Sequence, residues 1–250
     1  MRALLTGIFP ALERELEVTG IGPLTLLTGY QTPGAIRRIG ASRLAAWLRR
    51  RGVYKADALA QAAVDAAARQ RTVFPGEHQA AQLVATLARQ VLELFGKVAD
   101  LDRQIAARFG EHRQAKVILS LPGMGPLLGA EFLAATGGDM DWFETPDRLA
   151  GIAGLAPAPR DSGRVSGNHH RPQRFHRGLQ RVFYMSAQSS IRGCEESRLF
   201  YERKRAEGKR HVQAVLALAR WRVNVLWALL REDRCFEPAR CVDTPAGAYP

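Results

Sequence analysis

The chain has 250 residues, of which 46% are hydrophobic and 24% charged, and its formal net charge is +12. This composition excludes an intrinsically disordered chain, and no apolar run reaches the roughly 18 residues that a membrane-spanning helix needs. The positive charge favours an anionic partner, with nucleic acid ahead of a membrane surface.

Most of the positive charge is arginine, because lysine occurs only at positions 55, 97, 116, 204 and 209. Arginine binds phosphate in a bidentate way, but a GC-rich genome also favours it over lysine, so both explanations remain open. The three cysteines, Cys194, Cys235 and Cys241, lack the spacing of a structural zinc site. The N-terminus also lacks the features of a cleavable signal peptide. The sequence therefore predicts a cytoplasmic protein with no metal of its own.

Apolar spacing predicts helices along most of the chain. Helical periodicity covers residues 2–17, a basic segment that begins at Pro33, and an alanine-rich stretch over 56–71. Further helices are expected over 179–192 and 209–231, and Thr145 with Pro146 predicts the start of a short helix. Alternating runs of β-branched residues are nearly absent, so the predicted fold is all-α, a helical bundle with few or no strands.

A long coiled-coil helix is expected in the middle of the chain. From residue 84 onward its apolar positions alternate in steps of three and four, at 84, 87, 91, 94, 98, 101 and 105. An internal helical hairpin and a dimer interface explain this seam equally well. The expected organisation is a helical linker region over 1–76, the coiled coil over 77–110, a C-terminal domain over 111–236 and a disordered tail over 237–250.

A Gly-x-Gly turn interrupts the apolar segment Leu121-Pro-Gly-Met-Gly-Pro-Leu-Leu128. A helix on each side would make it a helix-hairpin-helix, in which Gly123 and Gly125 let the backbone approach a DNA phosphate at a helix N-terminus. A tight turn whose glycines serve packing alone is the other interpretation. A shorter copy of the pattern lies at 19–27.

A basic loop over 159–178 follows. Its arginines, with one on the next helix, predict a footprint on the nucleic-acid backbone: Arg160, Arg164, Arg171, Arg174, Arg177 and Arg181. Ser162 and Ser166 each precede a glycine, which in isolation indicates a turn rather than a nucleophile. Phe175 is a candidate for base stacking or for the core. His169 and His170 lack a third ligand, so no metal site is predicted.

Two stretches, Leu119–Gly138 and Leu149–Gly163, resemble insertion-sequence transposases of the IS one-ten, one-sixteen and nine-oh-two group, which are related to Piv-type DNA invertases. The similarity extends to 27–33 and 213–220 and so covers most of the chain. The resemblance implies a bacterial, nucleoid-associated recombinase for DNA transposition. Its serine nucleophile would be Ser162, with Ser166 as second choice, linked covalently to DNA.

The resemblance further implies homo-oligomers formed through the coiled coil and a structured guide RNA as a possible partner. Members of the group begin with a RuvC-like domain whose acidic residues bind magnesium, and no such acidic cluster precedes the helices here. The chain is therefore expected to be a truncated copy that carries no cofactor and is inactive alone. The competing hypotheses are a non-catalytic nucleic-acid-binding module and a vestigial fragment.

Overall fold

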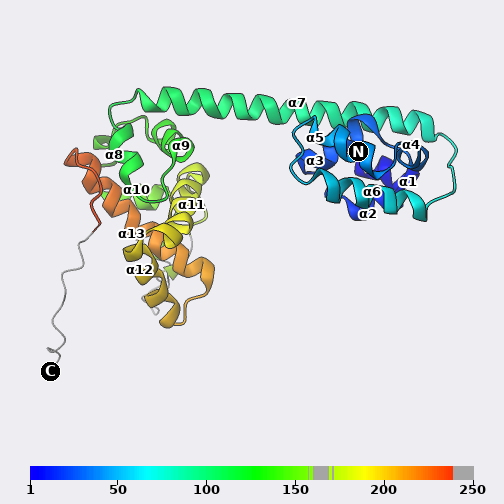
Figure 1. Ribbon diagram of the computed structural model, residues 1–250. Helices are drawn as coiled ribbons and strands as arrows, with labels where there is room; N and C mark the ends of the chain where they lie inside the picture. Colours follow the sequence, from blue (N-terminus) through cyan, green and yellow to red (C-terminus); the bar gives the residue numbers. More distant parts are fainter. Residues whose placement is uncertain (157, 160–168, 171, 239–250) are drawn as a thin grey trace, which may run out of the picture. The chain divides into compact units, whose positions relative to one another are not determined.

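The computed structural model describes residues 1–156, 158–159, 169–170 and 172–238. The predicted all-α class is confirmed, because almost every element is a helix (Figure 1). The chain divides into two compact units, Met1–Leu101 and Asp102–Pro250. In the part of the chain that the structure describes, no helix has both the length and the apolar character to cross a membrane.

The first unit contains six short helices and the start of a long one. They are α1 (Arg2–Ile8), α2 (Pro10–Glu15), α3 (Ile21–Gly29), α4 (Pro33–Ile39), α5 (Ala41–Arg49), α6 (Ala56–Arg69) and α7 (Glu77–Gly110). The single helix expected over 2–17 is wrong, because Phe9 leaves the helical conformation (φ −145°, ψ 62°) immediately before Pro10. Proline lacks the N–H that a continuous helix needs and disfavours helical geometry in the residue before it.

Alanine lets the helices of the first unit approach closely. Helix α6 packs against α2, α4 and α5, and its alanines at 56, 60, 63, 66 and 67 are all buried. Thr32 caps α4 by accepting a hydrogen bond from the Ala35 N–H. Gly40, at φ 72°, separates α4 from α5, so the basic segment after Pro33 forms two helices rather than one.

Helix α7 begins and ends where the long helix was expected. Val84 and Ala88 are buried in the core of the first unit, and Val91 is partly buried against it. Beyond Val91 the side chains at the seam positions are open to solvent: Leu94 is 57% exposed, Val98 54%, Leu101 56% and Ile105 42%. The first part of the seam therefore belongs to the core, while a coiled coil formed by the second part stays a prediction.

The second unit contains α8 (Ala115–Ser120), α9 (Pro126–Thr136), the 3₁₀ helix η1 (Asp141–Phe143), α10 (Pro146–Ile152), α11 (Arg177–Gly193), α12 (Glu195–Ala206) and α13 (His211–Arg231). The expected cap of α10 is confirmed, since Thr145 Oγ1 accepts from the Arg148 N–H at 3.2 Å. Helix α12 was not expected from the sequence. It is short of apolar residues, and its buried member is a serine, Ser197.

Helix α13 provides the centre of the second core. Its apolar stripe, expected from the sequence, is buried. The helix packs against α11, α10, α12 and α8 (Figure 1). Two short strands, β1 (Ala158–Pro159) and β2 (His169–His170), pair antiparallel, with Pro159 opposite His169.

Candidate nucleic-acid interface

The Gly-x-Gly turn joins α8 to α9, and its first glycine is fixed by packing. Gly123 has φ 79°, which side chains rarely adopt. A Cβ atom there would lie 2.5 Å from the Ser186 carbonyl oxygen and 2.9 Å from the Ser190 nitrogen, both in the backbone of α11. Gly123 therefore lets the turn lie directly against α11, and this contact is sufficient reason for a glycine.

The second glycine, Gly125, faces open space. It caps α9 in an extended conformation (φ −83°, ψ 174°), and a Cβ atom built on it meets nothing within 4 Å. Pro126 takes the first helical position, where its missing N–H costs nothing. The packing interpretation thus accounts for Gly123, whereas the start of α9 is left free for the phosphate contact that remains a prediction.

A buried arginine that sequence reasoning missed holds the same turn. Arg222 on α13 is 1% exposed and donates to the Pro122 carbonyl oxygen and, at 2.8 Å, to Ser186 Oγ. Its Nη1 lies 3.5 Å from Ser197 Oγ, and its Nε has no hydrogen-bond partner. The turn is thereby connected to α11, α12 and α13. The sequence feature that could have revealed this residue is the position of an arginine within the apolar stripe of α13.

Burial makes the charge of Arg222 costly. Desolvation lowers the pKa of its guanidinium to about 10, against a smaller opposing effect of nearby Cys194. The group remains charged at neutral pH. Because an uncompensated charge in the core is expensive, its hydrogen bonds to the turn are a structural requirement.

The predicted phosphate-binding arginines that the structure describes lie on or just before α11. Arg174, Arg177 and Arg181 are all exposed. Arg181 forms an ion pair with Glu131 of α9, so part of its charge is balanced. The other three, Arg160, Arg164 and Arg171, lie outside the described residues, as do Ser162 and Ser166.

Local contacts fix the start of α11. His176 caps the helix, with its Nδ1 accepting from the Leu179 N–H at 3.1 Å, and its own N–H donates to the Ile152 carbonyl oxygen. Phe175 lies against Gly154, where an added Cβ would come within 2.6 Å of the ring. Phe175 is therefore a packing residue, while Arg174 and Arg177 on either side of His176 point to solvent.

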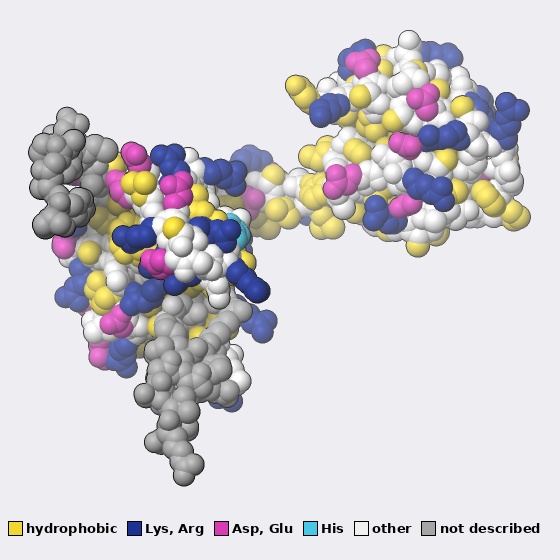
Figure 2. Space-filling model, turned by 90° about the horizontal axis from the view of Figure 1, so that it is seen from below, with side chains coloured by type: hydrophobic (Ala, Val, Ile, Leu, Met, Phe, Trp, Pro, Cys, Tyr) yellow, Lys and Arg dark blue, Asp and Glu magenta, His cyan; other side chains and the backbone are white. Residues whose placement is uncertain are grey.

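Positive charge is not confined to this site. On the face shown in Figure 2, Lys and Arg side chains are spread over both units with Asp and Glu among them. Exposed Arg174 and Arg177 have neither an ion pair nor a side-chain hydrogen bond in the described part of the chain. Within the same residues, no three His, Cys, Asp or Glu side chains come together as a metal site would require.

Comparison with known proteins matches the segment that contains the Gly-x-Gly turn and the start of α11 to a family. Residues 115–202 match the sequence model of the transposase family IS116/IS110/IS902. The chain is 55% identical over 234 residues to a 42 kDa protein of insertion element IS900 from Mycobacterium paratuberculosis. The chain is related to the IS116/IS110/IS902 transposases.

Other relatives belong to the same kind of element. The chain is 52% identical over 240 residues to a 44.8 kDa protein of IS116 from Streptomyces clavuligerus, and 36% identical over 239 residues to a 43.6 kDa protein of IS110 from Streptomyces coelicolor. These alignments cover 96% and 95% of this chain, and the IS900 alignment covers 93%. The chain spans only 59% to 60% of the length of these three relatives.

Proposed function

We propose that the chain forms the DNA-binding, serine-bearing part of a transposase that moves an insertion element. The observation that carries the proposal is the family match over 115–202, which includes the Gly-x-Gly turn, the basic loop and Ser162 in one segment. Arg174 and Arg177 support DNA as the partner, because both are exposed at the end of that loop. Such contacts position the DNA backbone without reading its sequence.

In the proposed reaction, Ser162 Oγ attacks the phosphorus of a DNA phosphodiester. The hydroxyl proton passes to a base, for which Asp161 and the neighbouring histidines are candidates, and the bond from phosphorus to one deoxyribose oxygen breaks. That oxygen takes up a proton and leaves as a free hydroxyl, so the DNA is held as a phosphoserine ester. The arginines of the loop stabilise the charge that develops on the phosphoryl oxygens.

Magnesium is implied by the RuvC-like domain of the related transposases and not by the residues of this chain. The described residues offer no cluster of carboxylates or imidazoles that fits such an ion. Any magnesium used in the reaction would therefore be held by the RuvC-like domain that the resemblance implies.

The same proposal includes a homo-oligomer, formed through the exposed apolar residues of α7 beyond Val91. Leu94, Val98, Leu101 and Ile105 continue the three-and-four spacing of a coiled-coil seam. A guide RNA is a further partner that the resemblance implies.

A covalent adduct tests the nucleophile. The chain is incubated with end-labelled duplex DNA that carries the ends of an insertion element, alone and with the N-terminal part of the IS900 protein supplied separately. When the N-terminal part is present, we expect a labelled adduct that survives denaturing electrophoresis for the wild type and for Ser166→Ala, and none for Ser162→Ala. An adduct with Ser162→Ala would show that Ser162 is not the nucleophile.

A non-catalytic DNA-binding role is the second candidate. It is favoured by the exposed arginines, which can bind DNA phosphates without any reaction taking place. It predicts DNA binding without an adduct under every condition, whereas the first proposal predicts both. The same gel therefore separates the two.

A further inference from the structure

Positive charge is concentrated in one part of the first unit. Residues 18–56 contain six arginines and one lysine but no aspartate or glutamate, although the whole chain has 24 acidic residues in 250. All seven basic side chains are exposed. Because like charges repel one another, such a segment favours an anionic partner. It lies outside the family match over 115–202.

Two of these arginines have structural roles. Arg49 on α5 forms an ion pair with Asp57 on α6. Arg37 on α4 donates to the carbonyl oxygens of Ala67 and Gln70 at the end of α6, at 2.6 and 2.5 Å. These two side chains therefore connect α4 and α5 to α6, and the charge available to a partner lies on the other arginines.

The remaining arginines of α4 and α5 form a surface that we call the basic face: Arg38, Arg43, Arg50 and Arg51. Arg43 and Arg50 are seven residues apart, which is close to two helical turns, so both project from the same side of α5. That side faces away from Leu44 and Leu48, which are buried in the core. The basic face is therefore the solvent side of α5, extended by Arg38 of α4.

Contacts with uncharged groups hold two of these side chains in place. The Nε and Nη2 atoms of Arg43 donate to the carbonyl oxygens of Ile39 and Arg38, at 2.9 and 3.1 Å. The Arg51 guanidinium lies over the Trp47 ring, 3.8 Å from its centre. The guanidinium groups of Arg38 and Arg50 form neither an ion pair nor a hydrogen bond among the described residues. No carboxylate thus balances any of the four charges.

The surroundings of the basic face distinguish between anionic partners. Arg51 lies on the Trp47 ring, Tyr30 meets the ring edge-on at 5.1 Å between centroids, and a Cβ atom at Gly29 would come within 2.6 Å of it. The ring thus supports Arg51 and is a poor platform for an unpaired base. Among the described residues from 22 to 53, no large apolar side chain is exposed, so the face has nothing to insert into a lipid bilayer.

We propose that the basic face binds the phosphate backbone of double-stranded DNA. Arginine suits this partner because its planar guanidinium binds phosphate oxygens in a bidentate way. From Arg43 to Arg50 the face extends about 10 Å along α5, or about three base-pair steps of one strand. The choice of DNA over duplex RNA rests on the proposed function. The face goes beyond that function, because it adds a DNA contact in the first unit to those of Arg174 and Arg177.

Binding of the whole chain to a fluorescein-labelled DNA duplex of arbitrary sequence tests the face, because backbone contacts do not depend on sequence. Arg38→Gln combined with Arg50→Gln should weaken binding at least about tenfold. The slope of log K against log salt should become shallower by about 1.8, since each lost phosphate contact accounts for about 0.9. Both side chains are exposed, so hydrogen exchange of α5 and α6 should stay as in the wild type.

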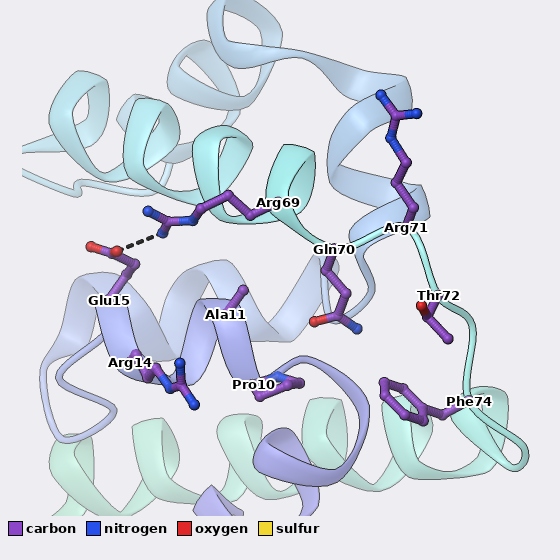
Figure 3. Close-up of a pocket in the computed structure, with 9 residues that line it drawn as sticks. All are labelled: Pro10, Ala11, Arg14, Glu15, Arg69, Gln70, Arg71, Thr72 and Phe74. Carbon is purple, nitrogen blue, oxygen red and sulfur yellow. Dashed lines mark hydrogen bonds and ion pairs between the residues drawn. The ribbon is translucent and has the colours of Figure 1, made fainter.

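Arg14→Gln combined with Arg71→Gln is the matched control. It removes the same charge from two exposed arginines of the same unit, which likewise have no ion pair or side-chain hydrogen bond among the described residues. The two side chains point away from each other across the pocket shown in Figure 3, where Arg69 is paired with Glu15. Because Arg14 and Arg71 do not form one face, this pair should bind the duplex nearly as the wild type does.

Two results would overturn the proposal. One is an Arg38 and Arg50 variant whose affinity for the DNA duplex and salt slope match those of the control pair. The other is a loss that is larger for an RNA duplex of the same sequence, or for phosphatidylserine vesicles, than for the DNA duplex. Arg174→Gln combined with Arg177→Gln should weaken DNA binding additively with the basic-face pair, so failure of this face and failure of the proposed function are separate results.

Discussion

Replacing Gly123 with alanine should destabilise the second unit, because the new Cβ would enter the backbone of α11. The added atom would lie 2.5 Å from the Ser186 carbonyl oxygen and 2.9 Å from the Ser190 nitrogen, and neither can rotate away. The positive φ of 79° costs alanine at least about 1 kcal/mol, and overpacking against a fixed neighbour typically adds about 1–3 kcal/mol. The expected loss is about 2–4 kcal/mol.

The matched control is Gly125→Ala, two residues away in the same turn. Its φ is −83° and nothing lies within 4 Å of the added Cβ, so the expected loss is only that of a poorer cap, below about 1 kcal/mol. Hydrogen exchange followed by mass spectrometry on peptides from α9 and α11 measures the free energy of opening in this unit alone. Peptides from α6 should exchange as in the wild type.

The result that would refute this reasoning is equal protection of α11 in both variants. Gly123 would then not be required by packing, and a direct role in binding phosphate would be its remaining explanation. A loss of DNA binding by Gly125→Ala, with α11 protection intact, would instead support the phosphate contact at the start of α9.

Two further predictions concern the core and α7. Arg222→Lys should lower the stability of the second unit by about 1–3 kcal/mol and speed amide exchange at Gly123 and Met124, because lysine keeps the buried charge but loses the forked donors that hold the turn. Wild-type stability of this variant in urea unfolding would contradict the prediction. Leu94→Lys combined with Leu101→Lys should convert the proposed oligomer to a monomer, as measured by light scattering, because two charges would enter the seam. Leu83→Lys is the control, since Leu83 is exposed on the same helix but lies outside the seam, and it should leave the oligomer intact. If the double variant kept the molar mass of the wild-type oligomer, this interface would be excluded.

Periodicity was a reliable guide wherever a helix carries one long apolar stripe. Helix α13 and the extent of α7 followed from apolar spacing, because both run for many turns with a continuous stripe. Apolar spacing was a poor guide where a residue cannot continue a helix, as at Pro10, which divides the predicted first helix in two. Helix α12 was missed because its packing uses few apolar residues, and α12 buries a serine instead.

The sequence by itself determined the helical class, the Gly-x-Gly turn and its place in a transposase-like segment, since these depend on residue type and on neighbours a few positions apart. What only the tertiary structure decided is how that turn is used. Gly123 is required by an α11 backbone more than 60 residues away in the chain, and Arg222 reaches Pro122 across 100 residues. Spacing along a chain records short-range geometry, whereas contacts of this kind exist only after the helices have packed.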